Sequence, residues 1–466
     1  MSRLFTVSLF LFPILLVGCN PLSQADQPKA VIDISEHLTR ANHLAEAQQY
    51  SAALQTLAEA QQRNDTDARL YASQGQIYAS QHRWPLAEDA YRMALTLEAN
   101  QPDAIIGLSN TLLAQNKVSE AMIYWQQAID QQISLEIAWQ GLAQGYLINN
   151  DYTQARVAFA QVLTIHPTVD AQWAYAVLTF PENRNAARES LKAMPTQDER
   201  SQHLLDTLAN LSEDVNQAEA NKLMGVALVQ LNEWSLAHHL LTLSIRLDES
   251  DAETWAFLGY VESNLNLPAA DSFQNATKLM PELALIPYFE GLHFRQQGQL
   301  DEAIDRFLLA LDLDPNNLGV ALETAHTLAQ KGDYLSAEAW YQSIVELEPE
   351  TPFYQQMLTT FYIERSYQVA DKGLPAAERL LEIAPQSAVA HYSLGWAKFQ
   401  TNDPVGAEIA LRQAITLDPN SVTAHYYLGR LLHTLNRDDE AQQILTFVID
   451  HDTSGTLRDR VVKMLE

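Results

Sequence analysis

The single cysteine of this 466-residue chain, Cys19, is the first residue whose position suggests a chemistry. One thiol cannot close an intrachain disulfide, and it cannot supply the thiolate ligands of a four-ligand zinc site. The residues before it, Leu4–Val17, form a nearly continuous apolar run, and Arg3 is the only charge before Asp26. A run of about 14 residues is shorter than a membrane-spanning helix and has the order of a secretory signal peptide. The sequence therefore predicts a signal peptide over residues 1–18 and export of the rest.

The stretch Leu16, Val17, Gly18 and Cys19 resembles the lipobox of bacterial lipoproteins. This resemblance implies that Cys19 is lipidated and becomes the first residue of the mature protein. Asn20 follows it where inner-membrane members commonly carry aspartate, so the resemblance favours the outer membrane, with the chain facing the periplasm. Several acyl chains would hold the chain on the membrane more firmly than one. The alternative is an ordinary signal peptide with an incidental or buried cysteine.

No other group of residues has the spacing that catalysis or metal binding requires. Phosphate-binding, dinucleotide-binding, hydrolase and zinc-protease motifs are absent from the sequence. His238 and His239 are adjacent and point about 100° apart on a helix, which predicts solvated side chains rather than a metal site. Asp438, Asp439 and Glu440 suit the start of a helix better than a calcium loop. We therefore expect no enzymatic activity, no cofactor and no metal.

Composition predicts a folded, helical and acidic protein. Apolar residues make up 47% of the chain, which excludes wholesale disorder, and 58 acids against 29 bases give a net charge of −29. Nucleic-acid binding depends on clustered lysine and arginine, so we do not expect it here. The chain has only 16 glycines among many alanines, leucines and glutamines, which favours helices over a β-sandwich or barrel.

A 34-residue period runs through most of the sequence. Pro315 and Pro349 are one such period apart, as are Pro385 and Pro419. Within one unit, large residues, a small residue and a closing proline follow one another as Trp139, Leu142, Tyr146, Ala155, Phe159 and Pro167. Large residues form the apolar faces of two antiparallel helices, small residues let the helices approach, and proline ends the second helix. This pattern resembles the tetratricopeptide repeat (TPR).

The resemblance implies an all-α solenoid, a right-handed superhelix of about 11–12 helix-turn-helix repeats in two blocks. The copy starting at residue 252 requires a two-residue deletion, and the copy starting at 352 requires a two-residue insertion. The expected order is a flexible linker over 19–34, an N-terminal block over 35–195, an irregular helical connector over 196–217, a C-terminal block over 218–455 and a capping helix over 456–466. No second apolar run of 18 residues occurs, so we expect this body to be a soluble domain on a lipid tether.

By the same resemblance, positions 2, 5, 9, 12 and 13 of each repeat line a concave groove. In the second block these positions hold Tyr260, Tyr288, Arg295, His326, Tyr392, Trp396, Phe399, Tyr426, Arg430 and His433. In the first block they hold Arg69, Gln76, Asp103, Asn110, Gln140, Gln144 and Ile148. One groove is aromatic and the other polar. Rigid aromatic side chains in a concavity commonly anchor a peptide or a glycan, although some of these rings are expected to pack between repeats instead.

These features predict a lipid-anchored scaffold that docks partner proteins of an envelope assembly. By architecture it resembles the TPR lipoproteins of pilus biogenesis, protein secretion or exopolysaccharide export. Residues 218–466 carry 35 acids and 16 bases, which favours a partner with a basic segment there, unless the acids only keep a long solenoid soluble. The alternative function is an accessory protein that binds a nascent polysaccharide through the aromatic groove.

Overall fold

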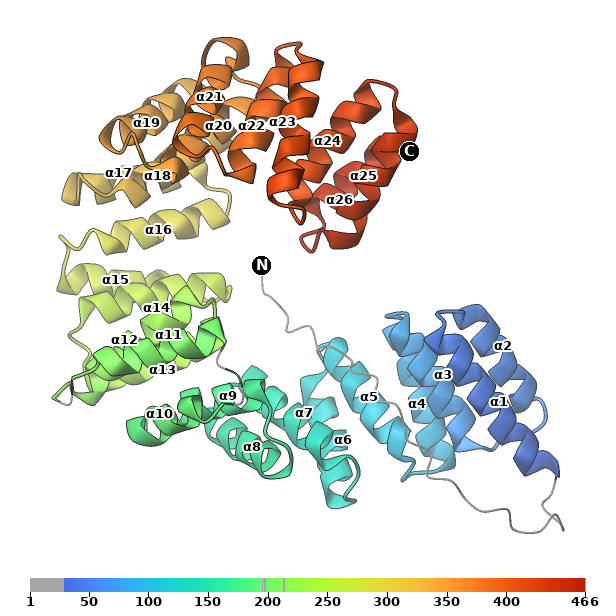
Figure 1. Cartoon of the computed structure of the whole chain (residues 1–466). Helices are drawn as coiled ribbons and strands as arrows, with labels where there is room; N and C mark the ends of the chain where they lie inside the picture. Colours follow the sequence, from blue (N-terminus) through green and yellow to red (C-terminus); the bar gives the residue numbers. More distant parts are fainter. Residues whose placement is uncertain (1–28, 195, 197, 213, 466) are drawn as a thin grey trace. The chain divides into compact units, whose positions relative to one another are not determined.

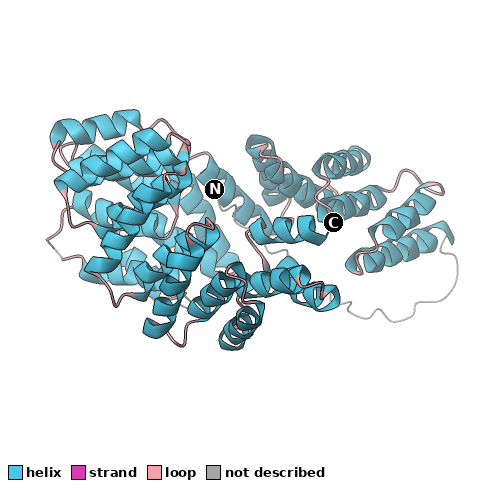
Figure 2. Cartoon of the chain, turned by 90° about the horizontal axis from the view of Figure 1, so that it is seen from above, coloured by secondary structure: helices cyan, strands magenta, loops and turns pink. Residues whose placement is uncertain are grey.

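The computed structural model describes residues 29–194, 196, 198–212 and 214–465, and the regular structure in these ranges is entirely helical (Figure 2). This confirms the all-α fold class. None of the helices in these ranges is long and apolar enough to cross a membrane. Cys19 and most of the expected linker lie outside the described residues. The expected linker over 19–34 overlaps the first helix, which begins at Lys29.

The chain divides into two compact units between Ser272 and Phe273, called here the N unit and the C unit. The N unit contains α1 (Lys29–Glu46), α2 (Tyr50–Gln61), α3 (Ala68–Ser80), α4 (Trp84–Leu97), α5 (Pro102–Ala114), α6 (Val118–Asp130), α7 (Leu135–Ile148), α8 (Tyr152–Ile165), α9 (Val169–Thr179), α10 (Arg184–Lys192), α11 (Glu199–Asn210), α12 (Gln217–Gln230), α13 (Trp234–Leu247) and α14 (Ala252–Asn264).

The helix α15 (Ala270–Leu279) spans the division between the units. The C unit contains α16 (Leu285–Gln296), α17 (Leu300–Leu313), α18 (Leu318–Lys331), α19 (Tyr334–Leu347), α20 (Pro352–Glu364), the π-helix η1 (Val369–Gly373), α21 (Leu374–Ile383), α22 (Ala388–Gln400), α23 (Pro404–Leu417), α24 (Val422–Thr434), α25 (Asp438–His451) and α26 (Thr456–Leu465).

Neighbouring helices pack as antiparallel pairs, and within each unit successive pairs contact one another, directly or, between α10 and α12, through α11 (Figure 1). The pairs in the N unit are α1/α2, α3/α4, α5/α6, α7/α8, α9/α10 and α12/α13, and those in the C unit are α16/α17, α18/α19, α20/α21, α22/α23 and α24/α25. Small residues make this packing possible. A Cβ atom on Gly141 would collide with the ring of Trp125, which is fully buried. A Cβ atom on Gly291 would likewise collide with the equally buried ring of Phe307.

The turns between paired helices share one backbone feature, a residue with positive φ, in all the pairs named above except α9/α10. A residue with positive φ, usually asparagine, ends the turn at Gln48, His82, Asn116 and Asn150. Asparagine tolerates this left-handed conformation better than most residues. The interval is two positions shorter than the regular period between Asn266 and Gly298, and two positions longer between Ser366 and Asn402. These two intervals agree with the deletion and the insertion expected from the sequence.

The extra residues of the long repeat are accommodated between α20 and α21. Ser366 and Gln368 both have positive φ, and the π-helix η1 follows them directly. A π-helix closes its hydrogen bonds from i to i+5, so one of its turns holds more residues than a turn of α-helix and takes up part of the insertion. The repeat therefore keeps its register despite the insertion.

The segment over 196–217 is less irregular than the sequence suggested. It contains the regular helix α11, whose Leu204 and Leu208 are buried in a core that also includes Leu191 of α10 and Met224 of α12. This core continues from Ala143 to Val261. The N unit therefore extends through the expected connector, and the structure divides the chain near residue 272 instead. The last helix, α26, buries Val461 against the last repeat.

Candidate functional site

The first helices of the repeats carry the side chains that the sequence assigned to a groove. In the C unit, two of those side chains belong to the core. Trp396 of α22 is 4% exposed and Tyr426 of α24 is 5% exposed. The Trp396 ring stacks on Tyr427 with centroids 4.8 Å apart and lies 4.9 Å from Phe399. The interpretation of Trp396 and Tyr426 as ligand anchors is therefore corrected, because burial against the neighbouring repeat already uses their surface.

Arg430 covers what remains of the Trp396 ring. Its guanidinium carbon lies 4.5 Å from the ring centroid, and the arginine side chain itself is exposed. A cation over an indole face gains about 0.5–1 kcal/mol at exposed sites. Arg430 is thus the exposed residue of this cluster, and it presents a charge rather than an aromatic face.

The other predicted residues near α22 and α24 are half-buried. Tyr392 lies 5.9 Å from Tyr427, and burial together with the nearby Glu364 carboxylate raises the pKa of Tyr392 to about 12. Phe399 packs against Trp396, and His433 Nδ1 lies 2.8 Å from Asp438 Oδ1. The structure therefore brings Tyr392, Trp396, Phe399, Tyr426 and Arg430 into one cluster, but this cluster packs mainly against itself.

The remaining predicted residues lie apart from that cluster. Arg295 of α16 forms an ion pair with Glu323 of α18, and Tyr288 lies 5.5 Å from Phe289 and 6.2 Å from Phe307. Tyr260 belongs to the N unit, where it meets Trp234 edge-on at 5.7 Å. The predicted groove residues therefore do not make one continuous aromatic surface.

Exposed side chains on the first helices of the C unit include one large aromatic that the sequence analysis missed. Phe353, at the second position of α20, is 52% exposed. Its place two residues into the repeat matches the groove positions, so the repeat register could have identified it. Phe353 and Arg430 are consequently the accessible first-helix side chains that we use as probes of this unit.

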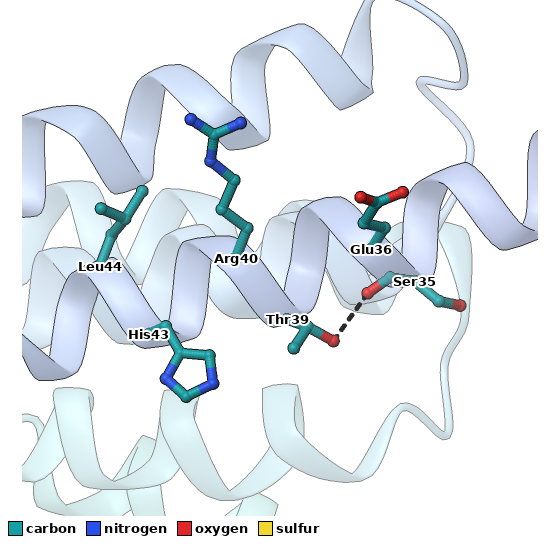
Figure 3. Close-up of a pocket in the computed structure, with 6 residues that line it drawn as sticks. All are labelled: Ser35, Glu36, Thr39, Arg40, His43 and Leu44. Atoms are coloured by element: carbon teal, nitrogen blue, oxygen red, sulfur yellow. Dashed lines mark hydrogen bonds between the residues drawn. The ribbon is translucent and has the colours of Figure 1, made fainter.

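Polar side chains dominate the first helices of the N unit. Gln76 and Asn110 are exposed, and Gln140 and Gln144 are half-buried. Arg69 is held by Asp67 through its Nη2 atom at 2.6 Å, so it is not a free cation. A hollow on α1 is lined by Ser35, Glu36, Thr39, Arg40, His43 and Leu44 (Figure 3). All six residues come from one helix, so the described residues supply only one wall of this hollow.

A buried carboxylate that sequence reasoning missed lies in the C unit. Glu338 of α19 is 3% exposed, and its Oε1 accepts hydrogen bonds from Tyr362 Oη and Lys372 Nζ, each at 2.5 Å. Burial and the contact with Glu338 raise the pKa of Tyr362. Lys372 comes from the π-helix η1, so the insertion supplies the cation. Glu338, Tyr362 and Lys372 are thus hydrogen-bonded to one another. We interpret this network as a stabilising contact between α19, α20 and η1 rather than as a reactive centre.

The histidine pair also differs from the sequence interpretation. His239 stacks on Tyr152 of α8 with centroids 3.8 Å apart, and burial lowers the pKa of His239 to about 4. Tyr152 Oη donates to the backbone oxygen of Ser235 at 2.9 Å. His239 is therefore a neutral packing residue that joins α8 to α13. Among the described residues, no group of three or more histidine, cysteine, aspartate or glutamate side chains could hold a metal ion.

Comparison with known proteins identifies the repeats. Tetratricopeptide repeat models match residues 38–105, 294–360, 370–422 and 410–443. The chain is 21% identical to protein O-mannosyl-transferase TMTC3 of Homo sapiens, over 74% of this chain and 38% of that protein. It is 20% identical to anaphase-promoting complex subunit CDC16 of Saccharomyces cerevisiae, over 77% of this chain and 46% of that protein. The chain thus spans less than half the length of these curated relatives.

Among solved structures, yeast Tom70 is similar with a TM-score of 0.42 and 15% identity, over 94% of this chain and 95% of that chain.

Proposed function

We propose that this chain of tetratricopeptide repeats is a scaffold that docks partner proteins on its first helices and is held in the bacterial envelope by a lipid on Cys19. The observation that carries the proposal is the repeated presentation of accessible side chains at the groove positions of first helices: Gln76, Asn110 and Arg430 share the ninth position of their repeats, and Phe353 stands at the second position of its own. Stacked repeats of this kind create extended binding surfaces.

Catalysis is not the function that the described side chains favour. Chemical groups that are buried and close together, such as Glu338 with Tyr362 and Lys372, are fully engaged with one another. A reactive site needs a nucleophile or base with room for a substrate beside it. We therefore propose a binding role without a reaction.

The envelope location rests on the sequence alone. The apolar run before Cys19, the small residue Gly18 and the lone thiol coincide at one point. The lipid would fix the chain to the periplasmic face of the outer membrane, where it would serve a pilus, secretion or exopolysaccharide-export assembly. A protein partner is preferred over the alternative of a nascent polysaccharide, because Trp396 and Tyr426 are buried and cannot stack on sugar rings.

In-cell photocrosslinking tests this function. A photoreactive residue placed at Gln76, Asn110, Phe353 or Arg430 should capture a discrete protein partner, because these first-helix positions face outward. The matched positions are Gln161 of α8 and Ile409 of α23, which are exposed on second helices. These two should capture little. Equal capture from second helices, or no protein capture from any first-helix position, would contradict the proposal.

A further inference from the structure

The last helix, α26, begins one repeat period after the start of α24, where the first helix of a further repeat would stand. Its Val462 and Leu465 follow Leu428 and Leu431 of α24 by the same period. Both leucines of α24 are buried, whereas Val462 is 43% exposed and Leu465 is 44% exposed. In a complete repeat the second helix covers these two positions, and no second helix follows α26 among the described residues. The helix therefore has an uncovered apolar face.

Two cations stand beside this apolar face. Arg458 and Lys463 hold the positions of Ala424 and Gly429 in α24, and a Cβ atom on Gly429 would already collide with Leu445 of α25. Both cations are exposed, and neither forms an ion pair with a carboxylate in the part of the chain that the structure describes. A neighbouring helix therefore cannot pack here as in a complete repeat, and needs acidic side chains to pair with the cations. We define the α26 face as Arg458, Val462, Lys463 and Leu465.

The outward side of α17 combines exposed leucines with acids. Leu308, Leu309 and Leu313 are exposed, and no other second helix in the described ranges exposes three large apolar side chains. Asp305 and Asp312 are also exposed and form no ion pair among the described residues. At 100° per residue, all five side chains fall on one side of the helix, which we call the α17 face. α17 carries four acids and one base, whereas α26 carries three bases and one acid.

The charges of the two faces have compatible spacings. At a rise of 1.5 Å per residue, Arg458 and Lys463 are about 7.5 Å apart along α26, and Asp305 and Asp312 are about 10.5 Å apart along α17. Arginine and lysine have long side chains, whose charged heads can reach across this difference while their stems cover apolar surface. With the two helices side by side, both cations can therefore meet an acid while the apolar side chains of the two faces pack together.

The α26 face and the α17 face of one chain do not meet. The pairs from α18/α19 to α24/α25 separate the two helices within the C unit (Figure 1). A contact between them therefore needs two copies of the chain. Symmetric contacts are disfavoured, because α26 against α26 would oppose cations and α17 against α17 would oppose acids. The remaining arrangement places α26 of one copy on α17 of the next, a head-to-tail contact that produces rings or open chains.

We infer that the α26 face of one copy binds the α17 face of a second copy, so that the protein associates with itself head to tail. This inference goes beyond the proposed docking function and does not depend on it, because neither face includes the first-helix positions assigned to partner proteins. The helix α26 has only 10 residues, and interfaces that bury less than about 1,200 Å² are weak and transient. We therefore expect a dissociation constant of about 0.1 mM.

Sedimentation of the full chain at increasing concentration gives the test. The average mass of the wild type should rise near about 0.1 mM, and high salt should reduce this rise because it screens exposed charges. Arg458→Glu with Lys463→Glu should weaken the association at least about tenfold. Asp305→Lys with Asp312→Lys should weaken it equally. An equimolar mixture of these two variants should regain the association, because each reversed face then meets a face of opposite charge.

A matched pair of substitutions controls for charge alone. Asp89→Lys with Asp439→Lys makes the same change in charge on exposed positions of α4 and α25, and should change the association less than about twofold. Thermal melting checks that every variant is folded. A wild type that stays monomeric, an equal loss in the control pair, or a mixture that does not regain association would overturn the inference. A monomeric wild type whose α26 cations bind vesicles of phosphatidylglycerol would identify an anionic membrane as the occupant instead.

Discussion

Trp396→Ala is expected to destabilise the C unit by about 3–5 kcal/mol, the usual cost of removing a buried tryptophan. The ring is 4% exposed and fills the space between Phe399 and Tyr427, so its loss leaves a cavity between α22 and α24. Urea unfolding followed by circular dichroism measures the effect. The C unit should unfold at clearly lower urea concentration than in the wild type.

Two substitutions of accessible side chains serve as controls for the loss of stability expected of Trp396→Ala. Phe353→Ala removes a ring that is 52% exposed and should cost less than about 1 kcal/mol. Arg430→Ala removes the cation above Trp396 and should cost about 0.5–1 kcal/mol. If Trp396→Ala unfolds like the wild type but loses its partner, the ring is a recognition residue, as the sequence first suggested.

Lys372→Met is expected to destabilise the C unit by about 2–3 kcal/mol, less than the roughly 3–5 kcal/mol that breaking a fully buried pair costs. The substitution removes the ammonium group that lies 2.5 Å from the buried Glu338 carboxylate and leaves that charge without its cation. The expected loss is at the smaller end because the Lys372 side chain is 38% exposed. Urea unfolding measures it.

The double variant Glu338→Gln with Lys372→Met checks this explanation. It removes the charge as well as its partner, and the glutamine carbonyl introduced at that position still accepts a hydrogen bond from Tyr362. Urea unfolding should show the double variant to be more stable than Lys372→Met alone. A double variant that is as unstable as the single one, or less stable, would mean that the cost of Lys372→Met comes from lost packing around η1 and not from an unpaired charge.

The repeat architecture was predictable because each unit repeats its local rules. Glycine or alanine is needed where two helices approach closely, and most turns need a residue that tolerates positive φ. A repeat with a weak signature can therefore still be located from the 34-residue period of the repeats beside it. The same regularity located the deletion before Gly298 and the insertion before Asn402. Boundaries were less predictable, because α11 has no repeat signature and joins the core through Leu204 and Leu208.

The repeat register alone does not predict whether a side chain at a groove position is buried or exposed. Asn110 and Trp396 occupy the same position in their repeats, yet Asn110 is exposed and Trp396 is buried. Burying a large apolar ring against an adjacent helix stabilises the folded chain, and the Trp396 ring is buried in this way against Tyr427. An amide gains nothing from such burial and stays outward.

Contacts between distant segments were missed for a different reason. Glu338 meets Lys372 only because η1 turns the inserted residues toward α19, and His239 meets Tyr152 only because the core continues past α9 and α10. Neither contact follows from the repeat period.

The affinity of a purified partner, identified by photocrosslinking, tests the docking claim most directly. Asn110→Arg with Phe353→Arg places a long cation on an accessible first helix in each unit, whereas Gln161→Arg with Ile409→Arg makes the same two changes in charge on second helices. The first pair should weaken binding at least about tenfold, or about 1.4 kcal/mol, and the second less than about twofold. Equal weakening by both pairs, or weakening by the second pair alone, would contradict docking on the first helices.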